Sequence, residues 1–534
     1  MNKAKYDGME HPVRQVTDLK DIIVSSCSMF KDDTAFLEKD KPGGTFQPVS
    51  YAKVKDDMDA LGTKLIDMGL KGCKIAVVGE TSYHWFLTYF AAVCGVGVIV
   101  PLDKNLPQDE LKSLVERSHA KAIVFSNRME KTVKPLFDKP GEIEYFISMS
   151  ESENEKVLSL VKLIEEGNKL LREGARNFVD AEINPQDMAS LLFTSGTTGK
   201  SKGVMLSHKN IAANVVNVSK RVMLDKGCVV LSILPVHHTY ENTIDWVTIY
   251  QGRTIAICEG IKYILRNMNE VKANCMVGVP LVFEKIFKGL MKQAEGRGEG
   301  EKIRNAIALS RRLKLYNNRS LIRKLFKPIH QAFGGGMHLF IAGGAAMDPE
   351  ITEAFEAMGI PMIQGYGMTE YAPIIAVNQD NYSIAKSVGR PMPETKVRID
   401  NADENGVGEI VVKGPSVMLG YYEDQEATDE AIEDGWLHTG DLGYLDSDDF
   451  LYLTGRKKTV IVTKGGKNIF PEELEAVLKE NELIKETLVH GVTDKTVGNV
   501  IVTADIQPNY ELLEEQRGKM SSSDVYHFYR ELVD

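Results

Sequence analysis

Cysteine is scarce in this chain, with six residues among 534, and these six form no CxxC pair and no Cys/His spacing of the kind that holds zinc. The pattern excludes a readable zinc site and indicates reduced thiols in a cytoplasmic protein. A basic surplus is also missing, since the formal net charge is -11. Nucleic acid is therefore not an expected partner. Anionic membranes gain little general attraction, which leaves room only for weak membrane association.

Long hydrophobic runs are almost absent, and only residues 85–102 have the length of a membrane span. Two glycines and a proline interrupt this run, and Thr81 or Ser82 before it can cap a helix. We therefore expect no transmembrane segment here. The prediction is a buried helix that ends near Cys94, followed by a buried strand.

The first half of the chain alternates short runs rich in valine and isoleucine with amphipathic helical stretches. Residues 74–80 and 97–102 are typical of buried strands, whereas residues 51–69 and 107–120 place apolar side chains three and four positions apart. This alternation predicts parallel sheets covered by helices. A chain of 534 residues is also too long for one core, so we expect two or more domains.

The character of the sequence changes from Lys396 onward, where short strands and turns follow one another. After Arg456 the pattern is a strand, a glycine loop and a helix opened by Pro471 at its first position. We therefore expect a turn-rich β unit after the α/β body, and then a small separate domain. The charged tail, residues 510–534, is typical of a solvated helical face.

Residues 191–208, LLFTSGTTGKSKGVMLSH, break an apolar run with a loop of glycines and hydroxyl side chains. Such a backbone can approach a ligand closely and present N–H and O–H donors, which suits a polyphosphate. A plain turn is the simpler interpretation. A Walker NTPase loop is the third, but Thr194 stands where that loop requires its first glycine, and residues 203–206 are typical of a strand where it requires a helix. The Walker interpretation therefore fails.

Five further motifs follow the loop in order. They are LPVHHTYE (234–241), FIAGGAAMDPEI (340–351), IQGYGMTE (363–370), GYYEDQEATDEAIEDGWLHTGDLG (420–443) and GRKKTVIVTKGGKNIFPEELE (455–475). Together with the loop, the set resembles the adenylate-forming, or AMP-binding, superfamily of acyl-CoA synthetases, luciferases and peptide-synthetase adenylation domains. The first and fourth of the five motifs resemble the long-chain fatty acyl-CoA synthetase branch.

The resemblance implies an α/β fold in two domains. A large N-terminal adenylation domain of helix-covered sheets with a β subdomain would span residues 1–455, and a small α+β lid domain would span residues 456–534. Members of the superfamily continue past a helix like the one at residues 521–534, to a segment whose lysine reaches the α-phosphate. We therefore expect the lid domain to be truncated, and the sequence leaves open whether that is natural.

The resemblance assigns the loop to the β and γ phosphates of ATP. By this match the phosphate-binding residues are Thr194, Ser195, Gly196, Thr197, Thr198, Gly199 and Lys202. Lys202, and not Lys200, matches the family's lysine, while Ser201 stands where many members have proline. Adenylation brings together two anions, a carboxylate and the α-phosphate, so charge neutralisation is the chemistry expected of this loop.

The resemblance also implies a magnesium site and an adenine pocket. Glu370, with the Thr194 hydroxyl nearby, would bind Mg²⁺, because a hard cation between phosphates takes few protein oxygens. Tyr366 lies between two glycines and would stack on the purine, although a tyrosine packed in the core is the alternative. The other wall of the adenine pocket would consist of Gly343, Gly344 and Ala345.

The remaining matches concern ribose, the acid and CoA. Asp441, with Arg456 assisting, would accept hydrogen bonds from the ribose hydroxyls. His238 corresponds to the family's histidine beside the carboxylate and thioester path, and His237 is interpreted as a bystander. Lys458 matches the hinge on which the lid swings. The pantetheine arm of CoA would pass Gly465 and Gly466. Trp246 is interpreted as a core residue, with the acyl tunnel as the alternative.

The leading hypothesis is an ATP- and Mg²⁺-dependent fatty acid CoA ligase, in which His238, Glu370 and Lys202 carry the chemistry. Acid and ATP would give acyl-AMP and pyrophosphate, and CoA would then displace AMP. One alternative replaces CoA with an acyl carrier protein, and another is a non-catalytic protein that binds nucleotide or acyl-adenylate. A phosphoryl-transfer NTPase ranks last. The sequence leaves the acyl chain length and the oligomeric state open.

Overall fold

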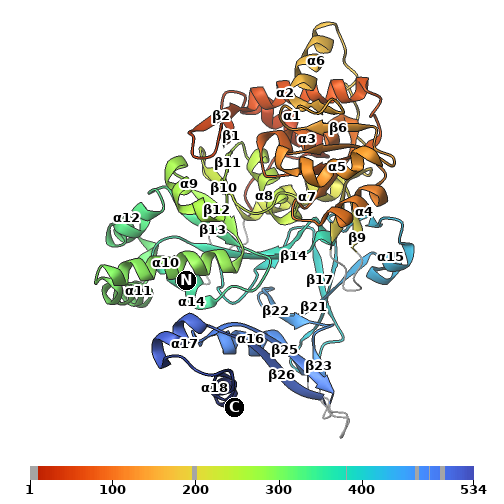
Figure 1. Ribbon diagram of the computed structural model, residues 1–534. Helices are drawn as coiled ribbons and strands as arrows, with labels where there is room; N and C mark the ends of the chain where they lie inside the picture. The colour runs from red at the N-terminus through yellow and green to blue at the C-terminus, as the bar shows by residue number, and fades with distance from the viewer. Residues whose placement is uncertain are drawn as a thin grey trace. The chain divides into compact units, whose positions relative to one another are not determined.

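The computed structural model describes residues 10–194, 201–380, 382–462, 468–479, 481–493 and 500–533. Contacts divide the chain into two compact units, the first Met1–Lys396 with Lys413–Gly435 and the second Val397–Val412 with Trp436–Asp534. Figure 1 shows helices on both faces of the sheets in the first unit. The predicted α/β class, with a large first unit and a smaller second one, is confirmed. The domain boundary at residues 455 and 456 stays a prediction.

One sheet of the first unit has eight strands. In sheet order they are β19 (Gly420–Tyr421), β9 (Lys202–Ser207), β8 (Met188–Thr194), β4 (Gly97–Leu102), β3 (Cys73–Val78), β5 (Ala120–Phe125), β6 (Tyr145–Ser148) and β7 (Val157–Ser159). Strands β4, β3, β5, β6 and β7 pair in parallel, as the alternating pattern predicts. The hairpin β8–β9 is antiparallel, and it carries the glycine-rich loop at its tip.

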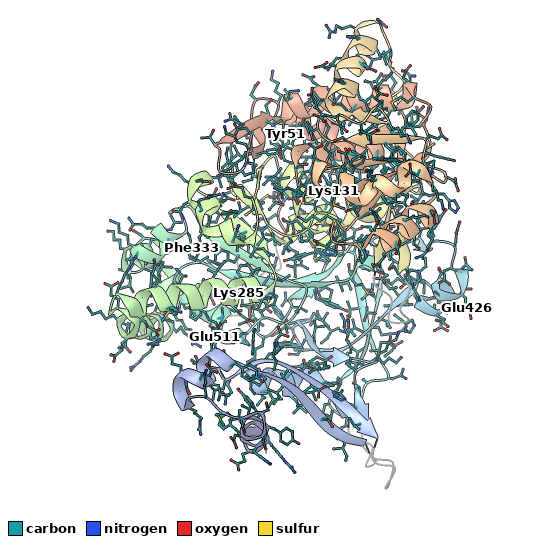
Figure 2. The ribbon with its side chains drawn as sticks, in the orientation of Figure 1. Tyr51, Lys131, Lys285, Phe333, Glu426 and Glu511 are labelled. Carbon is teal, nitrogen blue, oxygen red and sulfur yellow. The ribbon has the colours of Figure 1, made fainter. Side chains whose placement is uncertain are left out.

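The other sheet of the first unit has nine strands. In sheet order they are β16 (Arg390–Pro391), β15 (Ile374–Val377), β14 (Met362–Gly367), β13 (Leu339–Ala342), β12 (Cys275–Gly278), β10 (Val229–Ser232), β11 (Thr254–Ile257), β1 (Thr34–Lys39) and β2 (Phe46–Ser50). The strands from β14 to β1 run parallel. Its apolar core includes Phe283, Phe333, Phe340 and Phe355, of which Figure 2 labels Phe333.

Helices cover both sheets. They are α1 (Leu19–Met29), α2 (Tyr51–Asp67), α3 (Tyr83–Ala91), α4 (Gln108–Ser118), α5 (Glu130–Asp138), α6 (Leu160–Arg172), α7 (His208–Arg221), α8 (Thr239–Tyr250), α9 (Ile264–Val271), α10 (Pro280–Gly296), α11 (Gly300–Leu313), α12 (Arg319–Leu325), α13 (Lys327–Ala332), α14 (Pro349–Ala357) and α15 (Gln425–Ala431). Helix α7 begins with a capping box in which Ser207 and Asn210 bond each other's backbone N–H groups, at 3.1 and 2.9 Å.

The apolar run at residues 85–102 forms a buried helix and a buried strand, as predicted. Ser82 caps α3 by accepting a hydrogen bond from the Trp85 N–H, and a π-helical turn at Ala92–Val96 then leads into β4. Across the described ranges, no helix combines the length and apolar character needed to cross a membrane.

The second unit contains the turn-rich β structure predicted after residue 396. Strand β17 (Lys396–Asp400) lies beside β18 (Gly408–Lys413), which pairs with β21 (Trp436–Leu445), and β21 pairs with β22 (Leu451–Arg456). The following elements are β23 (Ile461–Val462), β24 (Asn468–Ile469), α16 (Pro471–Lys479), β25 (Ile484–Thr493), β26 (Val500–Pro508), α17 (Tyr510–Arg517) and α18 (Ser522–Val533).

The charged tail is helical and mostly exposed, as its composition predicts, but it also buries a few apolar side chains. Leu513 on α17 and Val525 and Tyr529 on α18 are buried against Ile484 at the start of β25. The Tyr529 hydroxyl also donates a hydrogen bond to the Leu483 carbonyl. Phe528 and Leu532 pack against the same cluster, so the two helices close a small core of their own.

Candidate active site

Several predicted site residues follow strand ends at one edge of the nine-stranded sheet. Gly343 comes directly after β13, Glu370 follows β14, and His238 follows β10. Because the carboxyl ends of parallel strands meet at one edge, three motifs far apart in the sequence come together there. The hairpin β8–β9 adds Thr194 at the end of one strand and Lys202 at the start of the next, and these two residues are register partners.

Tyr421 connects the Glu370 motif to the Lys202 strand. Its hydroxyl donates a hydrogen bond to Glu370 Oε1 at 2.9 Å, and the Lys202 ammonium lies 4.7 Å from the centre of its ring. The pairing of β19 with β9, with Tyr421 opposite Val204, sets this position. Burial and the adjacent Glu370 carboxylate raise the pKa of Tyr421 well above its usual value, so it remains a donor. The half-buried carboxylate is thereby held in one orientation.

His238 occupies the residue position just before α8, without a capping hydrogen bond from its side chain, and lies beside the Glu370 segment. The next residue, Thr239, has its hydroxyl 3.4 Å from that of Thr369, which immediately precedes Glu370. His237 is more enclosed than His238. Burial, followed by the neighbouring His238, lowers the pKa of His237 to about 4, and its Nε2 lies 3.7 Å from Asp103 Oδ2. His237 is therefore neutral near pH 7.

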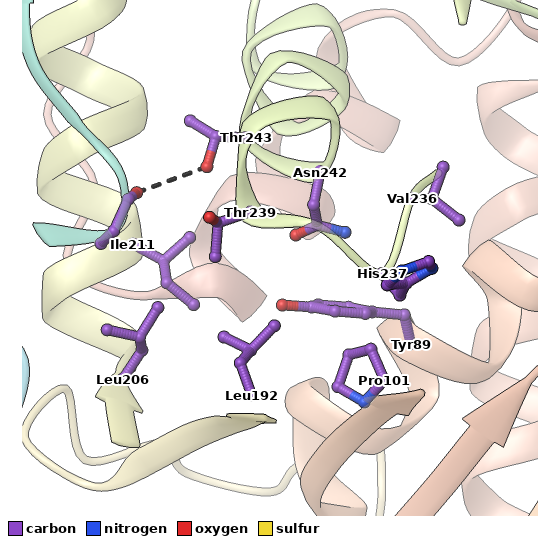
Figure 3. A pocket seen from close by; sticks show the side chains of 11 residues that line it. Tyr89, Pro101, Leu192, Leu206, Ile211, Val236, His237, Thr239, Asn242 and Thr243 are labelled. Atoms are coloured by element: carbon purple, nitrogen blue, oxygen red, sulfur yellow. Dashed lines mark hydrogen bonds between the residues drawn. The ribbon is translucent and has the colours of Figure 1, made fainter. Parts of the chain in front are cut away.

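A small cavity of about 10 Å³ lies between α7, α8 and the hairpin β8–β9 (Figure 3). It is enough for about one water molecule. Its lining includes Tyr89, Leu192, Ile211, His237 and Asn242. Trp246 does not line it: this side chain is 2% exposed and packs edge-on against Phe90 and Tyr89, at centroid distances of 5.1 and 6.0 Å.

The predicted adenine residues lie at the same sheet edge. Tyr366 is 6% exposed, a burial that the core-packing alternative also expects, so purine stacking stays a prediction. A Cβ on Gly343 would lie 2.8 Å from the Tyr240 ring, and one on Gly367 would lie 2.0 Å from the Pro373 carbonyl oxygen. These two glycines are therefore required by the close approach of the chain to itself, whether or not a ligand is bound.

The predicted ribose residues belong to the second unit and contact each other. Asp441 on β21 and Arg456 on β22 are register partners, and Arg456 Nε lies 3.2 Å from Asp441 Oδ1. Asp441 is largely buried and Arg456 is exposed. Lys458 follows on an exposed turn, and its neighbour Lys457 is paired with Glu409 at 2.7 Å.

Part of the predicted site lies outside the described residues. This holds for Ser195, Gly196, Thr197, Thr198 and Gly199 in the loop, and for Gly465 and Gly466 on the CoA path. Within the described ranges, no group of three or more His, Cys, Asp or Glu side chains could hold a metal by itself. Glu370 nevertheless fits Mg²⁺, because a cation that bridges phosphates needs only one or two protein oxygens.

Sequence reasoning missed Tyr421 and the contact between Thr239 and Thr369. Tyr421 stands in the quoted motif GYYEDQEAT, but no local pattern shows that its partner is a glutamate 51 positions earlier. The two threonines immediately follow His238 and precede Glu370, so proximity to predicted site residues was the only available signal.

The comparisons with known proteins agree with this geometry. The AMP-binding enzyme family matches residues 24–422, and the chain belongs to that family. Long-chain-fatty-acid–CoA ligase FadD15 of Mycobacterium bovis is 27% identical over 497 residues, which cover 90% of this chain and 81% of that protein. The chloroplastic long-chain-fatty-acid–[acyl-carrier-protein] ligase AEE15 of Arabidopsis thaliana is 25% identical, covering 93% of this chain and 77% of that protein.

Solved structures share the fold. O-succinylbenzoate coenzyme A synthetase of Bacillus subtilis, in complex with ATP and a magnesium ion, superposes with a TM-score of 0.71 at 21% identity. The superposition covers 94% of this chain and 93% of that one. The superposition confirms the predicted fold, and the family match over residues 24–422 confirms the predicted membership of the AMP-binding enzymes.

Proposed function

We propose that this chain is an ATP-dependent fatty acid CoA ligase of the cytoplasm. It would join a carboxylate to AMP with release of pyrophosphate, and then transfer the acyl group to the thiol of CoA. One observation carries the proposal: Glu370, fixed by Tyr421, lies beside the Lys202 strand and next to the Thr239 contact of α8. A carboxylate, a cation and the end of a phosphate-type loop are the groups that adenylation requires at one place.

In the first step, Lys202 and the loop would bind the β and γ phosphates, while Glu370 and Thr194 would hold Mg²⁺. The metal would supply charge neutralisation between the phosphates. Tyr421 would keep Glu370 aimed at that position by its 2.9 Å hydrogen bond. His238, on the exposed start of α8, would flank the acid as it attacks the α-phosphorus in line.

In the second step, Lys458 would act as the hinge and the CoA arm would pass Gly465 and Gly466. Attack of the thiol sulfur on the acyl carbonyl carbon would break the bond to the AMP oxygen, and AMP would leave with that electron pair. The adenine would rest between Tyr366 and the turn of Gly343, Gly344 and Ala345, with its ribose hydroxyls on Asp441 near Arg456.

We expect Asp441→Ala to weaken ATP binding more than Lys200→Ala does. The Asp441→Ala variant would lose two hydrogen bonds between the carboxylate and the ribose hydroxyls, each worth on the order of 1.5–3 kcal/mol. Lys200, by contrast, is not the lysine that matches the family. Isothermal titration calorimetry with a non-hydrolysable ATP analogue compares the two variants. Equal losses of affinity would show that the loop or the ribose site is misassigned.

An acyl carrier protein is the alternative acceptor, and the similarity to the Arabidopsis thaliana carrier-protein ligase is what favours it. For the CoA ligase we expect a thioester to form with free CoA at micromolar to millimolar concentration, without any carrier protein. Mass spectrometry of products from parallel reactions with CoA and with phosphopantetheinylated carrier protein separates the two. Acyl transfer to the carrier alone would replace CoA as the acceptor and leave the adenylation step intact.

A further inference from the structure

A basic stretch stands out on this acidic chain. Residues 302–347 contain nine lysines and arginines and no aspartate or glutamate, although the whole chain has a net charge of -11. The nine are Lys302, Arg304, Arg311, Arg312, Lys314, Arg319, Arg323, Lys324 and Lys327. All lie on α11, on α12, between these helices or at the start of α13. The exposed side chains of residues 302–327 are called the α11–α12 surface below.

Two of these cations form ion pairs. Arg304 pairs with Glu295 at 2.7 Å, and Arg311 pairs with Glu353. Among the residues that the structure describes, no ion pair within 4.0 Å engages the other exposed cations of the surface. These are Lys302, Arg312, Lys314, Arg323, Lys324 and Lys327. The surface therefore presents positive charge that the protein itself does not neutralise.

Apolar side chains project from the same two helices. Leu309 and Leu313 on α11 are 49% and 58% exposed, and Leu321 and Leu325 on α12 are 46% and 43% exposed. Each pair is spaced by four residues and so lies on one face of its helix. A single exposed leucine is ordinary, but each of the two helices combines such a pair with cations that form no ion pair in the described residues, a combination typical of amphipathic helices.

A pocket of about 380 Å³ opens on the flank of α12. Its lining is Asp225, Ser320, Arg323, His338, Gly359 and Pro361. Asp225, His338 and Pro361 each precede a strand, β10, β13 and β14, so the pocket lies at the amino ends of these strands. The site of Glu370 and His238 lies at their carboxyl ends. The guanidinium of Arg323 and the hydroxyl of Ser320 are donors suited to a phosphate oxygen.

We propose that the α11–α12 surface docks on anionic phospholipid bilayers, with a lipid headgroup phosphate seated against Arg323 in the pocket. Lysines and arginines near an anionic membrane each strengthen binding by roughly fivefold, and exposed leucines add binding by insertion at the headgroup boundary. The leucines favour a bilayer over nucleic acid, which offers no apolar layer. The acidic remainder of the chain is repelled by the same membrane, so the docked orientation is fixed by charge.

The test uses the full chain and sedimentation with vesicles of phosphatidylcholine alone or mixed with phosphatidylglycerol. We expect binding to the mixed vesicles only, with loss at high salt as the charges are screened. The triple variant R312E/K324E/K327E should lose at least tenfold in binding. The control K131E/K134E/K139E makes the same charge change at exposed positions on and beside α5, and it should bind like the original chain. Figure 2 labels Lys131.

Three further measurements distinguish a bilayer from free phosphate and from nucleic acid. The double variant L321S/L325S should bind mixed vesicles several-fold more weakly. Unchanged vesicle binding in this variant, or equal losses in the two triple variants, would overturn the proposal.

Calorimetry with inorganic phosphate tests the pocket. If Arg323→Ala abolishes phosphate binding without weakening vesicle binding, the pocket is a site for free phosphate. Tighter binding to a DNA oligonucleotide than to vesicles, unaffected by L321S/L325S, would identify a nucleic-acid surface. Circular dichroism checks the fold of every variant.

Discussion

Glu370→Gln should lower the rate of acid-dependent pyrophosphate release by about a hundredfold to a thousandfold, while leaving the fold intact. The amide keeps the size of the side chain and can still accept the hydrogen bond from Tyr421, but it lacks the charge that holds a hard cation beside the phosphates. The Mg²⁺ concentration that gives half the maximal rate should rise. A coupled pyrophosphate assay at several Mg²⁺ concentrations measures both quantities.

Glu426→Gln is the matched control, because Glu426 is an exposed carboxylate on α15, labelled in Figure 2. The rate of pyrophosphate release by Tyr421→Phe should lie between the rates of these two variants. We expect a decrease of about tenfold to a hundredfold, because the substitution removes one hydrogen bond to a charged group. If Glu370→Gln and Glu426→Gln have equal rates, Glu370 does not bind the metal, and the role of Tyr421 is structural only.

Trp246→Ala should lower the free energy of unfolding of the first unit by about 3–5 kcal/mol. The side chain is 2% exposed and fills the space between α8 and the aromatic side chains of α3, so its removal leaves a cavity that rigid neighbours cannot close. Hydrogen exchange of the α8 amides in increasing urea follows this unit separately from the second one.

The control is Tyr526→Ala, which removes an aromatic ring that is 63% exposed and should change stability by less than about 0.5 kcal/mol. If Trp246→Ala unfolds like the original chain but loses activity only toward long acids, Trp246 lines the acyl path instead of the core. The sequence leaves that alternative open.

Much of the fold can be read from local pattern. The strands at residues 74–80 and 97–102 appear as β3 and β4, the helices at 51–69 and 107–120 appear as α2 and α4, and Pro471 is the first residue of α16. Each of these elements is encoded by hydrophobic period and by residues that cap or open a helix, which act within a few positions. Elements encoded by such local patterns keep their predicted type in the folded protein.

Contacts between residues far apart in the sequence could not be predicted from local pattern. The short strand β19 joins the edge of the eight-stranded sheet by pairing Tyr421 with Val204, and this pairing helps to bring Tyr421 to Glu370 and Lys202. Neither strand's own sequence specifies the partner. The packing of Tyr529 against Ile484 is a similar case, because a few apolar positions in a charged tail suffice for a small core.

In the candidate site, local motifs identify the residues, and long-range pairing of strands determines where they lie. Motif order identifies His238, Glu370 and Lys202. The topology places His238 and Glu370 at one sheet edge because β10 and β14 are parallel strands that end there. Lys202 belongs to β9 of the other sheet, and Tyr421 connects it to Glu370. The glycines that the motifs contribute carry less information about ligands than their pattern suggests. Gly343 and Gly367 are already required by their contacts with Tyr240 and Pro373.

In the proposed reaction, ATP is split between its α and β phosphates by an acid whose acyl group then passes to CoA. The most direct measurement incubates the chain with ATP, Mg²⁺ and a panel of carboxylic acids of increasing chain length, with and without CoA, and identifies all products by mass spectrometry. We expect AMP and pyrophosphate only when an acid is present, and an acyl-CoA when CoA is added. ADP and phosphate as products, or ATP bound and left intact with every acid, would contradict it.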